Sequence, residues 1–451
     1  MEKIVIDGGR PLHGSIRCSG AKNAALPILI ATLLAPGEHR LTNVPELADT
    51  SSTLSLLGRI GCPSLVQGSV RLDTTRIAFC EAPYDVVRKM RASVLVLGPM
   101  LARCGEARVS LPGGCAIGTR PIDQHLKGLE ALGCRFELEG GYINGIAHDL
   151  KGAEIHLDMP TVTGTENILM AAVLARGTTR IHNAAREPEV VDLVHFLQNL
   201  GAKITGEGTS TLTIEGVPRL WPASRPYSIV PDRIEAGTYL CAAAIAGGDV
   251  EVTGCAPQLL EASLHKLREA GCHVEVGETS VRLRRDTPLR SFSARTEPYP
   301  GLATDMQAQL MAVATVAAGT SRIEETIFEN RFMHAAELTR MGARIQHVGR
   351  LATVEGVEAL KGAQVMASDL RASAALVLAG LAAQGLTEVL RIYHLDRGYE
   401  DLVGKLRGVG ARIVRAPDTT DTDAMIEALD AADRADVSPE EEMAAGAPVS
   451  S

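Results

Sequence analysis

A cysteine lies in a glycine-rich stretch of the chain, Leu111 to Asp123, which reads LPGGCAIGTRPID. Three glycines in so short a segment disfavour a helix or a central strand, because glycine loses the most backbone freedom on ordering. We therefore expect a loop that either moves or lets a ligand approach its backbone. The thiol of Cys115 and the guanidinium of Arg120 together suggest chemistry on an anion. A surface turn with an incidental cysteine is the alternative, which spacing alone does not exclude.

The composition indicates a globular protein. Of its 451 residues, 45% are hydrophobic and 22% charged, and the length favours two domains or one large one. No apolar run reaches the roughly 20 residues that span a bilayer, and the first residues do not resemble a secretory signal. The nine cysteines are scattered singly, without a CxxC pair. This pattern argues against a disulfide framework or a zinc site and predicts a cytoplasmic protein.

The net charge of −9 belongs to the C-terminal segment. From Asp418 onward there are ten acidic residues and one basic residue, so the rest of the chain carries 44 of each sign. With no basic excess in the body, we expect neither nucleic-acid nor membrane binding. Residues 418–451 are predicted to be an acidic disordered tail of unknown partner, whose deletion leaves turnover unchanged if it is inert.

The chain repeats itself six times. In each copy an amphipathic helical segment ends at a glycine and runs into a short strand, at intervals of about 70 residues. Glycine there stops a helix because it adopts the left-handed conformation cheaply. The six stops are Gly61, Gly133, Gly201, Gly271, Gly342 and Gly410.

Alanine-rich segments alternate with these helices and are apolar on most sides. A helix that is apolar all round is buried, so these helices should lie inside and the strands outside. Trp221 to Asp232 is Pro-rich and divides the copies into two sets of three. We expect one domain over residues 22–229 and a discontinuous one over 1–21 plus 230–417, in which the first 21 residues pair with strands of the last copies. A cleft between two such domains is a common ligand site.

Cations stand at the starts of several alanine-rich helices, namely Lys22, Arg91 and Arg371. The helix dipole opposes a cation there, so an anionic partner is expected and an anion-binding site is favoured. Ordinary capping, for which Asp369 and Thr165 are suitable residue types, is the alternative.

Other polar residues are less specific. Arg331 and Arg397 lie between repeats and are suited either to anions or to ordinary salt bridges. The histidines His125, His334 and His394 lack metal-ligand spacing and are interpreted as packing or supporting residues. No phosphate-loop or dinucleotide motif is present, so we expect neither a metal nor another cofactor.

Seven motifs carry a resemblance to a known family. SGAKNAALP, KMRASVLVLGP, SLPGGCAIGTRPID, TDMQAQ, FENRFMH, SDLRASAALVLAG and RIYHLDRGYED resemble, in order, those of the UDP-N-acetylglucosamine 1-carboxyvinyltransferases, which are enolpyruvyl transferases. The similarity runs from the first residues to about Ala416. It implies an α/β fold of two inside-out domains, each of three βαβαββ units.

The resemblance also implies an activity. Enzymes of this family transfer the enolpyruvyl group of phosphoenolpyruvate to the 3-hydroxyl of UDP-N-acetylglucosamine, releasing phosphate, in the first step of peptidoglycan precursor synthesis. By resemblance, Cys115 is the general acid at carbon 3 of phosphoenolpyruvate and the target of fosfomycin, in a loop that acts as a movable lid. Asp305 is similarly implied to be the base near the sugar hydroxyl.

The family's binding residues match positions of this chain. The resemblance implies that phosphoenolpyruvate is bound, and its developing charge held, by Lys22, Asn23, Arg120, Arg371 and Arg397. Arg331 and Asp369 are implied to support this site. The residues implied to contact the UDP-sugar are Asn23, Arg91, Arg120, Pro121, Asp123, Gln124, Thr161, Val162, Thr163, Asp305 and Ile327. The family has a second form of TVTGTEN, with glycine where Thr163 stands.

Three other functions compete with this one. The sister enzyme that uses shikimate 3-phosphate has the same architecture but lacks the cysteine loop. A cysteine hydrolase would need a base paired to Cys115, for which His125 is the near candidate in sequence. A non-enzymatic paralogue would have no need of the set Lys22, Cys115, Asp305 and Arg397.

Overall fold

The computed structural model describes residues 2–87, 91–111 and 122–436. The chain divides into two compact units. Unit 1 comprises 1–18, 234–296 and 304–451, and unit 2 comprises 19–233 and 297–303. These bounds lie within a few residues of the expected domain limits, except that Glu297–Ala303 belongs to unit 2. The division falls after Arg233, at the end of the Pro-rich segment and not before it, because that segment contains a strand, Tyr227–Ser228, that belongs to unit 2.

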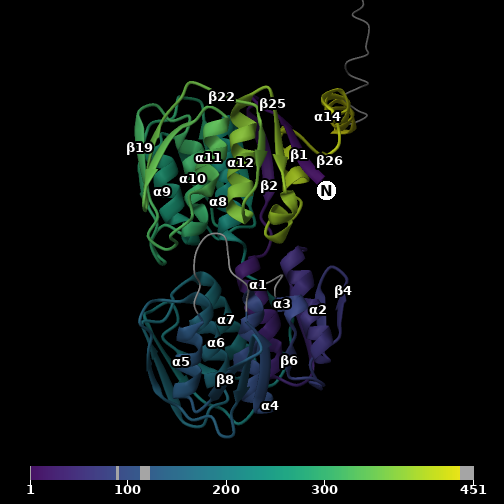
Figure 1. Cartoon of the computed structure of the whole chain (residues 1–451), viewed down its shortest axis with the longest axis vertical. Coiled ribbons are helices and arrows are strands. Elements are labelled where there is room, and N and C mark those ends of the chain that lie inside the picture. The colour runs from purple at the N-terminus through teal and green to yellow at the C-terminus, as the bar shows by residue number, and fades with distance from the viewer. Residues whose placement is uncertain (1, 88–90, 112–121, 437–451) are drawn as a thin grey trace, which may run out of the picture. The chain divides into compact units, whose positions relative to one another are not determined.

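Unit 2 is built on seven helices in its described part (Figure 1). They are α1 (Lys22–Ala31), α2 (Ala48–Ile60), α3 (Tyr84–Val87), α4 (Leu97–Cys104), α5 (Asp123–Ala131), α6 (Val162–Ala172) and α7 (Pro188–Asn199), with the 3₁₀ turns η1 (Thr32–Leu34) and η2 (Arg91–Val96). Its strands are β3 (Glu38–Thr42), β4 (Ser64–Val66), β5 (Val70–Asp73), β6 (Glu81–Ala82), β7 (Glu106–Ser110), β8 (Arg135–Glu139), β9 (Tyr142–Ile146), β10 (Glu154–His156), β11 (Thr178–His182), β12 (Lys203–Thr205), β13 (Thr211–Glu215) and β14 (Tyr227–Ser228).

Unit 1 has the same kinds of element. Its helices are α8 (Arg233–Ala246), α9 (Glu261–Glu269), α10 (Gln307–Ala314), α11 (Met333–Arg340), α12 (Leu370–Ala382), α13 (Leu402–Arg407) and α14 (Thr422–Asp436), with η3 (Pro257–Leu259), η4 (Thr304–Met306) and η5 (Ile392–Arg397). Its strands are β1 (Glu2–Asp7), β2 (Leu12–Arg17), β15 (Gly248–Thr253), β16 (His273–Val276), β17 (Ser280–Arg285), β18 (Ser293–Arg295), β19 (Thr320–Glu324), β20 (Arg344–Val348), β21 (Leu351–Glu355), β22 (Leu360–Lys361), β23 (Gln364–Met366), β24 (Ala383–Gln384), β25 (Leu386–Leu390) and β26 (Arg412–Pro417).

Six four-stranded sheets occur in the described residues, three in each unit, and all have the same pairing. In the order β10-β11-β13-β12, for example, the first pair is parallel and the other two are antiparallel. The corresponding orders are β14-β3-β5-β4, β6-β7-β9-β8, β2-β15-β17-β16, β18-β19-β21-β20 and β23-β25-β1-β26. The sheets thus confirm the sixfold repeat. All six glycine stops have the predicted positive φ, between 91° and 104°.

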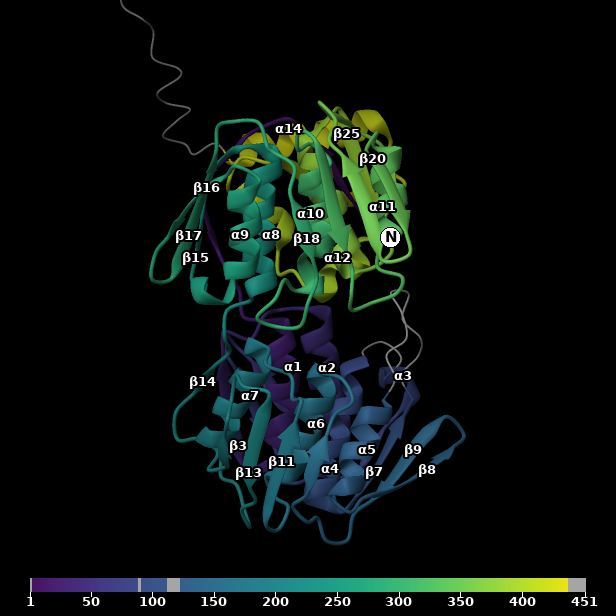
Figure 2. The same ribbon diagram turned by 90° about the vertical axis from the view of Figure 1, so that its left-hand side faces the viewer.

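The helices of the six repeats lie inside each unit and the sheets outside. In unit 1, α10 is buried along its whole length and α12 along nearly all of it, and the two pack side by side (Figures 1 and 2). In strands such as β11, alternate residues are buried and exposed, so one face of the sheet meets solvent. Alanine-rich helices suit the interior because small side chains let them approach closely. The predicted inside-out arrangement is confirmed within each unit.

The first residues of the chain complete two sheets of unit 1. β1 pairs with β25 and β26, whereas β2 pairs with β15. The prediction that the first 21 residues pair with the last copies is therefore confirmed for β1 and wrong for β2, whose partner belongs to the fourth copy. A strand's pairing partner is set by long-range topology, which its own residues do not reveal.

A helix forms where the sequence predicted a disordered tail. α14 packs on β26 (Figure 1) and buries Met425 and Leu429 in an apolar cluster with Val5, Val414 and Ala416. Arg412 forms ion pairs with Asp430 and Asp433. The prediction of disorder is thus wrong for Thr422–Asp436, because acidic residues that would repel one another alone are neutralised by partners elsewhere in the unit. Residues 437–451 lie outside the described part.

Candidate active site

Lys22 is the first residue of α1, and its charge is balanced by a carboxylate. Its Nζ lies 3.2 Å from Oδ2 of Asp49 on α2, with side-chain exposures of 13% and 5%. The expectation that a cation at a helix start requires an anionic partner is met here by the protein itself. Asn23, the next residue, is exposed. The start of α1 therefore presents one partly buried cation beside an exposed amide.

The start of α6 is capped by Thr161. Its side-chain oxygen accepts a hydrogen bond from the backbone N of Gly164 at 3.2 Å, so Val162 and Thr163 form the first turn. Thr165, considered from sequence as a cap, lies inside the helix, and its hydroxyl accepts from the backbone N of Ala185. All three predicted sugar-binding residues of this segment are half-buried at one helix start.

The start of α5 is tied to the segment that leads into α6. The Gln124 amide donates to Asp158 Oδ2 at 2.8 Å and accepts from the backbone N of Asp158 at 2.9 Å. Lys127 also pairs with Asp158, at 2.7 Å. The Gln124 side chain thus positions the approach to Thr161, while Asp123 is exposed. The structure brings Asp123 and Gln124 to the same part of unit 2 as the α6 start.

Unit 1 holds a compact ionic cluster around Asp305. Arg331 Nη2 donates to Oδ1 at 2.7 Å, and Arg371 Nη2 donates to Oδ2 at 2.8 Å. The two arginine side chains are 5% and 4% exposed, whereas that of Asp305 is 25% exposed. Burial by itself would raise the pKa of the Asp305 carboxyl, but the charges of Arg371 and Arg331 and their hydrogen bonds hold it well below its ordinary value. The carboxylate is thus ionised and held by two guanidinium groups.

A buried glutamate that sequence reasoning missed supports this cluster. Glu325 is fully buried and accepts from Thr304 Oγ1 at 2.8 Å, while Thr304 in turn accepts from Arg331 at 2.8 Å. Glu325 also accepts from the backbone N of Ile327 at 2.8 Å. It therefore connects the predicted contact Ile327 to the Asp305 cluster. A glutamate directly after a strand gave no signal, because glutamate at such a position is usually exposed.

Asp369 caps α12, and Arg371 follows in its first turn. The carboxylate of Asp369 accepts from the backbone N of Arg371 at 2.9 Å and of Ala372 at 3.1 Å. Ordinary capping was the alternative interpretation of Asp369, and the structure confirms it. The cap also fixes the first turn of α12, from which Arg371 reaches Asp305. Arg397, at the end of η5, is half-buried.

Several predicted residues lie outside the described part of the chain. These are Cys115, Arg120, Pro121 and the side chain of Arg91, whose backbone begins η2.

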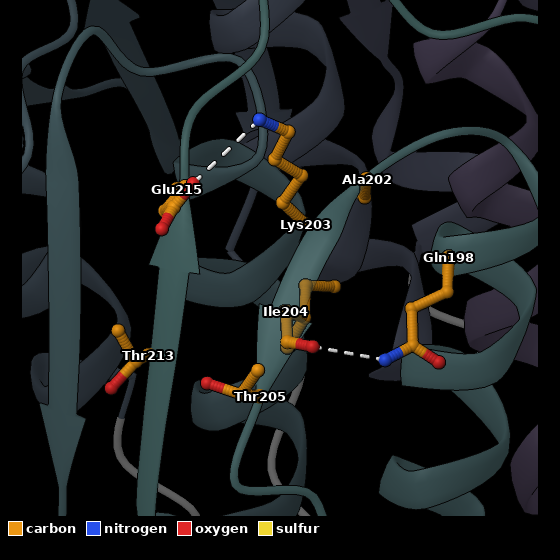
Figure 3. A pocket seen from close by; sticks show the side chains of 7 residues that line it. All are labelled: Gln198, Ala202, Lys203, Ile204, Thr205, Thr213 and Glu215. Atoms are coloured by element: carbon orange, nitrogen blue, oxygen red, sulfur yellow. Dashed lines mark hydrogen bonds and ion pairs between the residues drawn. The ribbon is translucent and has the colours of Figure 1, made fainter.

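A crevice of about 190 Å³ in unit 2 contains none of the predicted residues (Figure 3). It is lined by residues of α7, β12 and β13, among them the exposed ion pair Lys203–Glu215. Within the described ranges no helix is long and apolar enough to cross a bilayer, and no group of three or more His, Cys, Asp or Glu is arranged to hold a metal ion.

Two solved structures share this fold. The enolpyruvyl transferase NikO from Streptomyces tendae has a TM-score of 0.83 and 27% identity, covering 92% of this chain and 99% of its own. An EPSP synthase from Acinetobacter baumannii has a TM-score of 0.72 at 16% identity, covering 92% and 100%. The fold is therefore that of the enolpyruvyl transferases.

Sequence comparison defines the family. The family model described as EPSP synthase (3-phosphoshikimate 1-carboxyvinyltransferase) matches residues 6–406, and the chain belongs to this family of enolpyruvyl transferases. The UDP-N-acetylglucosamine 1-carboxyvinyltransferase of Nitratidesulfovibrio vulgaris (strain DP4) is 58% identical over 420 residues, covering 92% of this chain and 99% of the relative. The protein of that name from Anaeromyxobacter dehalogenans (strain 2CP-C) is 57% identical over 422 residues, with the same coverage. The resemblance drawn from the seven motifs is confirmed.

Proposed function

We propose that this protein transfers the enolpyruvyl group of phosphoenolpyruvate to the 3-hydroxyl of UDP-N-acetylglucosamine and releases phosphate, the first step of peptidoglycan precursor synthesis. The observation that carries the proposal is the 55–58% identity, over nearly their full length, to relatives named for this activity. The single, scattered cysteines favour the cytoplasm as the place of the reaction.

The reaction requires a proton to reach carbon 3 of phosphoenolpyruvate while the sugar oxygen bonds to carbon 2. Cys115 donates that proton, and Asp305 accepts the proton of the sugar hydroxyl. Loss of phosphate from carbon 2 and of a proton from carbon 3 then gives the enol ether. Lys22, Arg120, Arg371 and Arg397 balance the charge of the phosphate and the carboxylate.

Asp305 needs help to act as a base. A carboxylate held by Arg331 and Arg371 has a lowered pKa and so a weak tendency to take a proton. The substrate's own anionic groups compete for the same guanidinium groups, and the Nε of Arg331 has no hydrogen-bond partner in the described residues. Binding of phosphoenolpyruvate thus weakens the hold on Asp305 and raises its basicity.

Burial makes two other cysteines of the chain, Cys62 and Cys272, less reactive. Burial raises the pKa of Cys62 and of Cys272 to about 11, so both stay protonated and unreactive near neutral pH. Fosfomycin is therefore expected to alkylate Cys115 first, which peptide mass spectrometry can establish. Modification of Cys62 or Cys272 ahead of Cys115 would contradict the role given to Cys115.

The test is a comparison of acceptors. Phosphate release from phosphoenolpyruvate is measured with UDP-N-acetylglucosamine, with shikimate 3-phosphate and with no acceptor. We expect release with the UDP-sugar alone. Release with shikimate 3-phosphate instead would assign the protein to the sister activity that the family description names.

A further inference from the structure

Three helices of unit 2 meet with unusually little space between them. A Cβ added to Gly128 of α5 would lie 2.1 Å from Cδ1 of Ile168 on α6, and one added to Gly98 of α4 would lie 2.3 Å from the carbonyl oxygen of Asn167. These two glycines therefore let α5 and α4 approach α6 closely. On α5, His125 precedes Gly128 by three residues and shares its helix face, so its ring reaches Asn167 and Thr163 on α6.

The orientation of the Asn167 side chain is fixed by two backbone groups. Its Oδ1 lies 2.7 Å from the backbone N of Gly98, which can only donate. Its Nδ2 lies 3.0 Å from the carbonyl oxygen of Val94, which can only accept. A rotated amide would place two donors together and two acceptors together, so this assignment is the one that satisfies both neighbours.

This amide determines the tautomer of His125. Asn167 Nδ2 also lies 3.1 Å from His125 Nδ1, so Nδ1 must accept and carry no proton. Burial lowers the pKa of His125 to about 4, against a smaller opposing effect of Asp123, so the ring is neutral near neutral pH. Its proton then lies on Nε2, which donates to Thr163 Oγ1 at 3.2 Å.

The consequence falls on the hydroxyl of Thr163. Because its oxygen accepts a hydrogen bond from His125 Nε2–H, its own proton must point elsewhere, and His125 is the one hydrogen-bond partner of this hydroxyl among the described residues. Thr163 is half-buried at the α6 start, beside Val162 and the cap Thr161. A ligand there meets a hydrogen-bond donor.

We propose that His125, oriented by Asn167, is a positioning residue that holds the Thr163 hydroxyl as a donor to an acceptor oxygen of the UDP-sugar. The inference rests on the proposed function for the identity of the ligand. It does not make His125 a base for Cys115, because the Nδ1 and Nε2 atoms are both engaged by α6. It also applies to the form of TVTGTEN present here, since glycine in place of Thr163 has no hydroxyl to orient.

Two substitutions of His125 separate positioning from packing. His125→Gln keeps an amide donor where Nε2 stands, whereas His125→Asn places its amide near Nδ1 and removes that donor. We expect His125→Asn to raise the Kd for UDP-N-acetylglucosamine about tenfold, as the loss of one well-placed hydrogen bond implies, and His125→Gln to restore most of it. The KM for phosphoenolpyruvate should change less than about twofold in both, because positioning acts on one substrate.

A double-mutant cycle with Thr163→Val tests the route of the effect. In the Thr163→Val background, His125→Asn should change the Kd for the UDP-sugar by less than about twofold, because the hydroxyl is already absent. A full effect in that background, or equal loss with His125→Gln and His125→Asn, would overturn the proposal.

The tautomer can be measured even if a variant fails to fold or the UDP-sugar fails to bind. In the full chain with ¹⁵N-labelled histidine, the long-range ¹H–¹⁵N correlations of His125 should show the proton on Nε2. A proton on Nδ1 would refute the inference. A protein with the Nε2 tautomer that neither binds the UDP-sugar nor releases phosphate would instead refute the proposed function.

Discussion

One cluster of candidate substrate-binding residues in unit 1 is charged, whereas one in unit 2 is neutral. In unit 1, Asp305 lies between Arg331 and Arg371, and all three groups are charged. In unit 2, Thr163 is oriented by His125 and Asn167, and none of these groups is charged near neutral pH. Each arrangement places a polar residue at or near a helix start, but one uses full charges and the other a chain of neutral hydrogen bonds.

The difference shows what each of these two clusters is suited to do. Buried guanidinium groups compensated by a carboxylate can exchange that carboxylate for a substrate anion, so the unit 1 cluster is suited to the charge-changing part of the reaction. A neutral chain with a fixed tautomer cannot exchange charge, but it defines donor and acceptor positions sharply. The unit 2 network is therefore suited to recognition.

The largest effect is expected from Asp305→Asn, which removes the negative charge from the ionic cluster of unit 1. It removes the proposed base, so phosphate release should fall by at least about a hundredfold. It also leaves two buried cations uncompensated, so we expect the free energy of unfolding to fall by about 3 kcal/mol. This is the low end of the range for a buried ion pair, because the Asp305 side chain is 25% exposed. Urea denaturation measures this change.

Asp249→Asn is the matched control for stability. Asp249 accepts two hydrogen bonds from Arg282, both of 2.7 Å, and is 25% exposed like Asp305, but its partner Arg282 is 53% exposed. Its loss should cost less than about 1 kcal/mol. Equal costs for the two variants would show that the Asp305 cluster is not a buried ionic site.

The second effect is on α14. It tests whether a loss of overall stability, without any change at the two clusters, is enough to reduce turnover. Leu429→Ala removes a side chain that is 1% exposed, and we expect a loss of about 3 kcal/mol in the free energy of unfolding. Ile426→Ala on the same helix removes a side chain that is 41% exposed and should cost less than about 1 kcal/mol.

Turnover of the folded Leu429→Ala protein should match that of the unsubstituted chain, because α14 packs on β26, which carries no residue of either cluster. A loss of turnover at constant folded fraction would give α14 a functional role. Equal stability of the two α14 variants would instead show that the helix does not dock on β26.

The smallest effect separates the two regions by pH. His125 takes up a proton near pH 6.5 in the unfolded chain but near pH 4 in the folded chain, so its contribution to stability is lost as the pH falls between these values. Relative to His125→Gln, the unsubstituted protein should lose about 2 kcal/mol between about pH 7 and about pH 5. Denaturant unfolding at several pH values checks this slope.

Asp305 also loses its contribution as the pH falls, but only in a more acidic range. Its folded pKa lies well below the ordinary 3.8, so its stabilising effect is complete above that value and is lost only in stronger acid. The difference between Asp305→Asn and the unsubstituted protein should thus stay constant from about pH 7 to about pH 5. If the stability difference between Asp305→Asn and the unsubstituted protein changed with pH in this range, or if that for His125→Gln did not, the assigned charge states would be wrong.

The repeat and its inside-out packing could be predicted from the sequence because both depend on local signals. A glycine stop and a helix apolar on all sides report their own conformation and burial, as Gly61 and α12 show. The pairing of β2 with β15 and the docking of α14 could not be predicted, because each depends on partners far away in the chain.

The candidate site residues came mainly from the resemblance to a known family, and their roles stay predictions. The resemblance named Asp305, Arg331 and Arg371 singly, and the structure adds that the three form one cluster. Glu325 and Asn167 were missed because a buried polar residue is recognised by its hydrogen-bond partners, which the sequence does not show. The hydrogen-bond partners of Gln124 and His125 could likewise be identified only from the structure.

The most direct test of the account is to identify the product as well as the phosphate. Purified protein is incubated with phosphoenolpyruvate and UDP-N-acetylglucosamine, phosphate is quantified, and the sugar nucleotide is analysed by mass spectrometry and NMR. We expect one enolpyruvyl ether at the 3-oxygen of the sugar for each phosphate released. Phosphate release without that ether, or an ether at another oxygen, would contradict it.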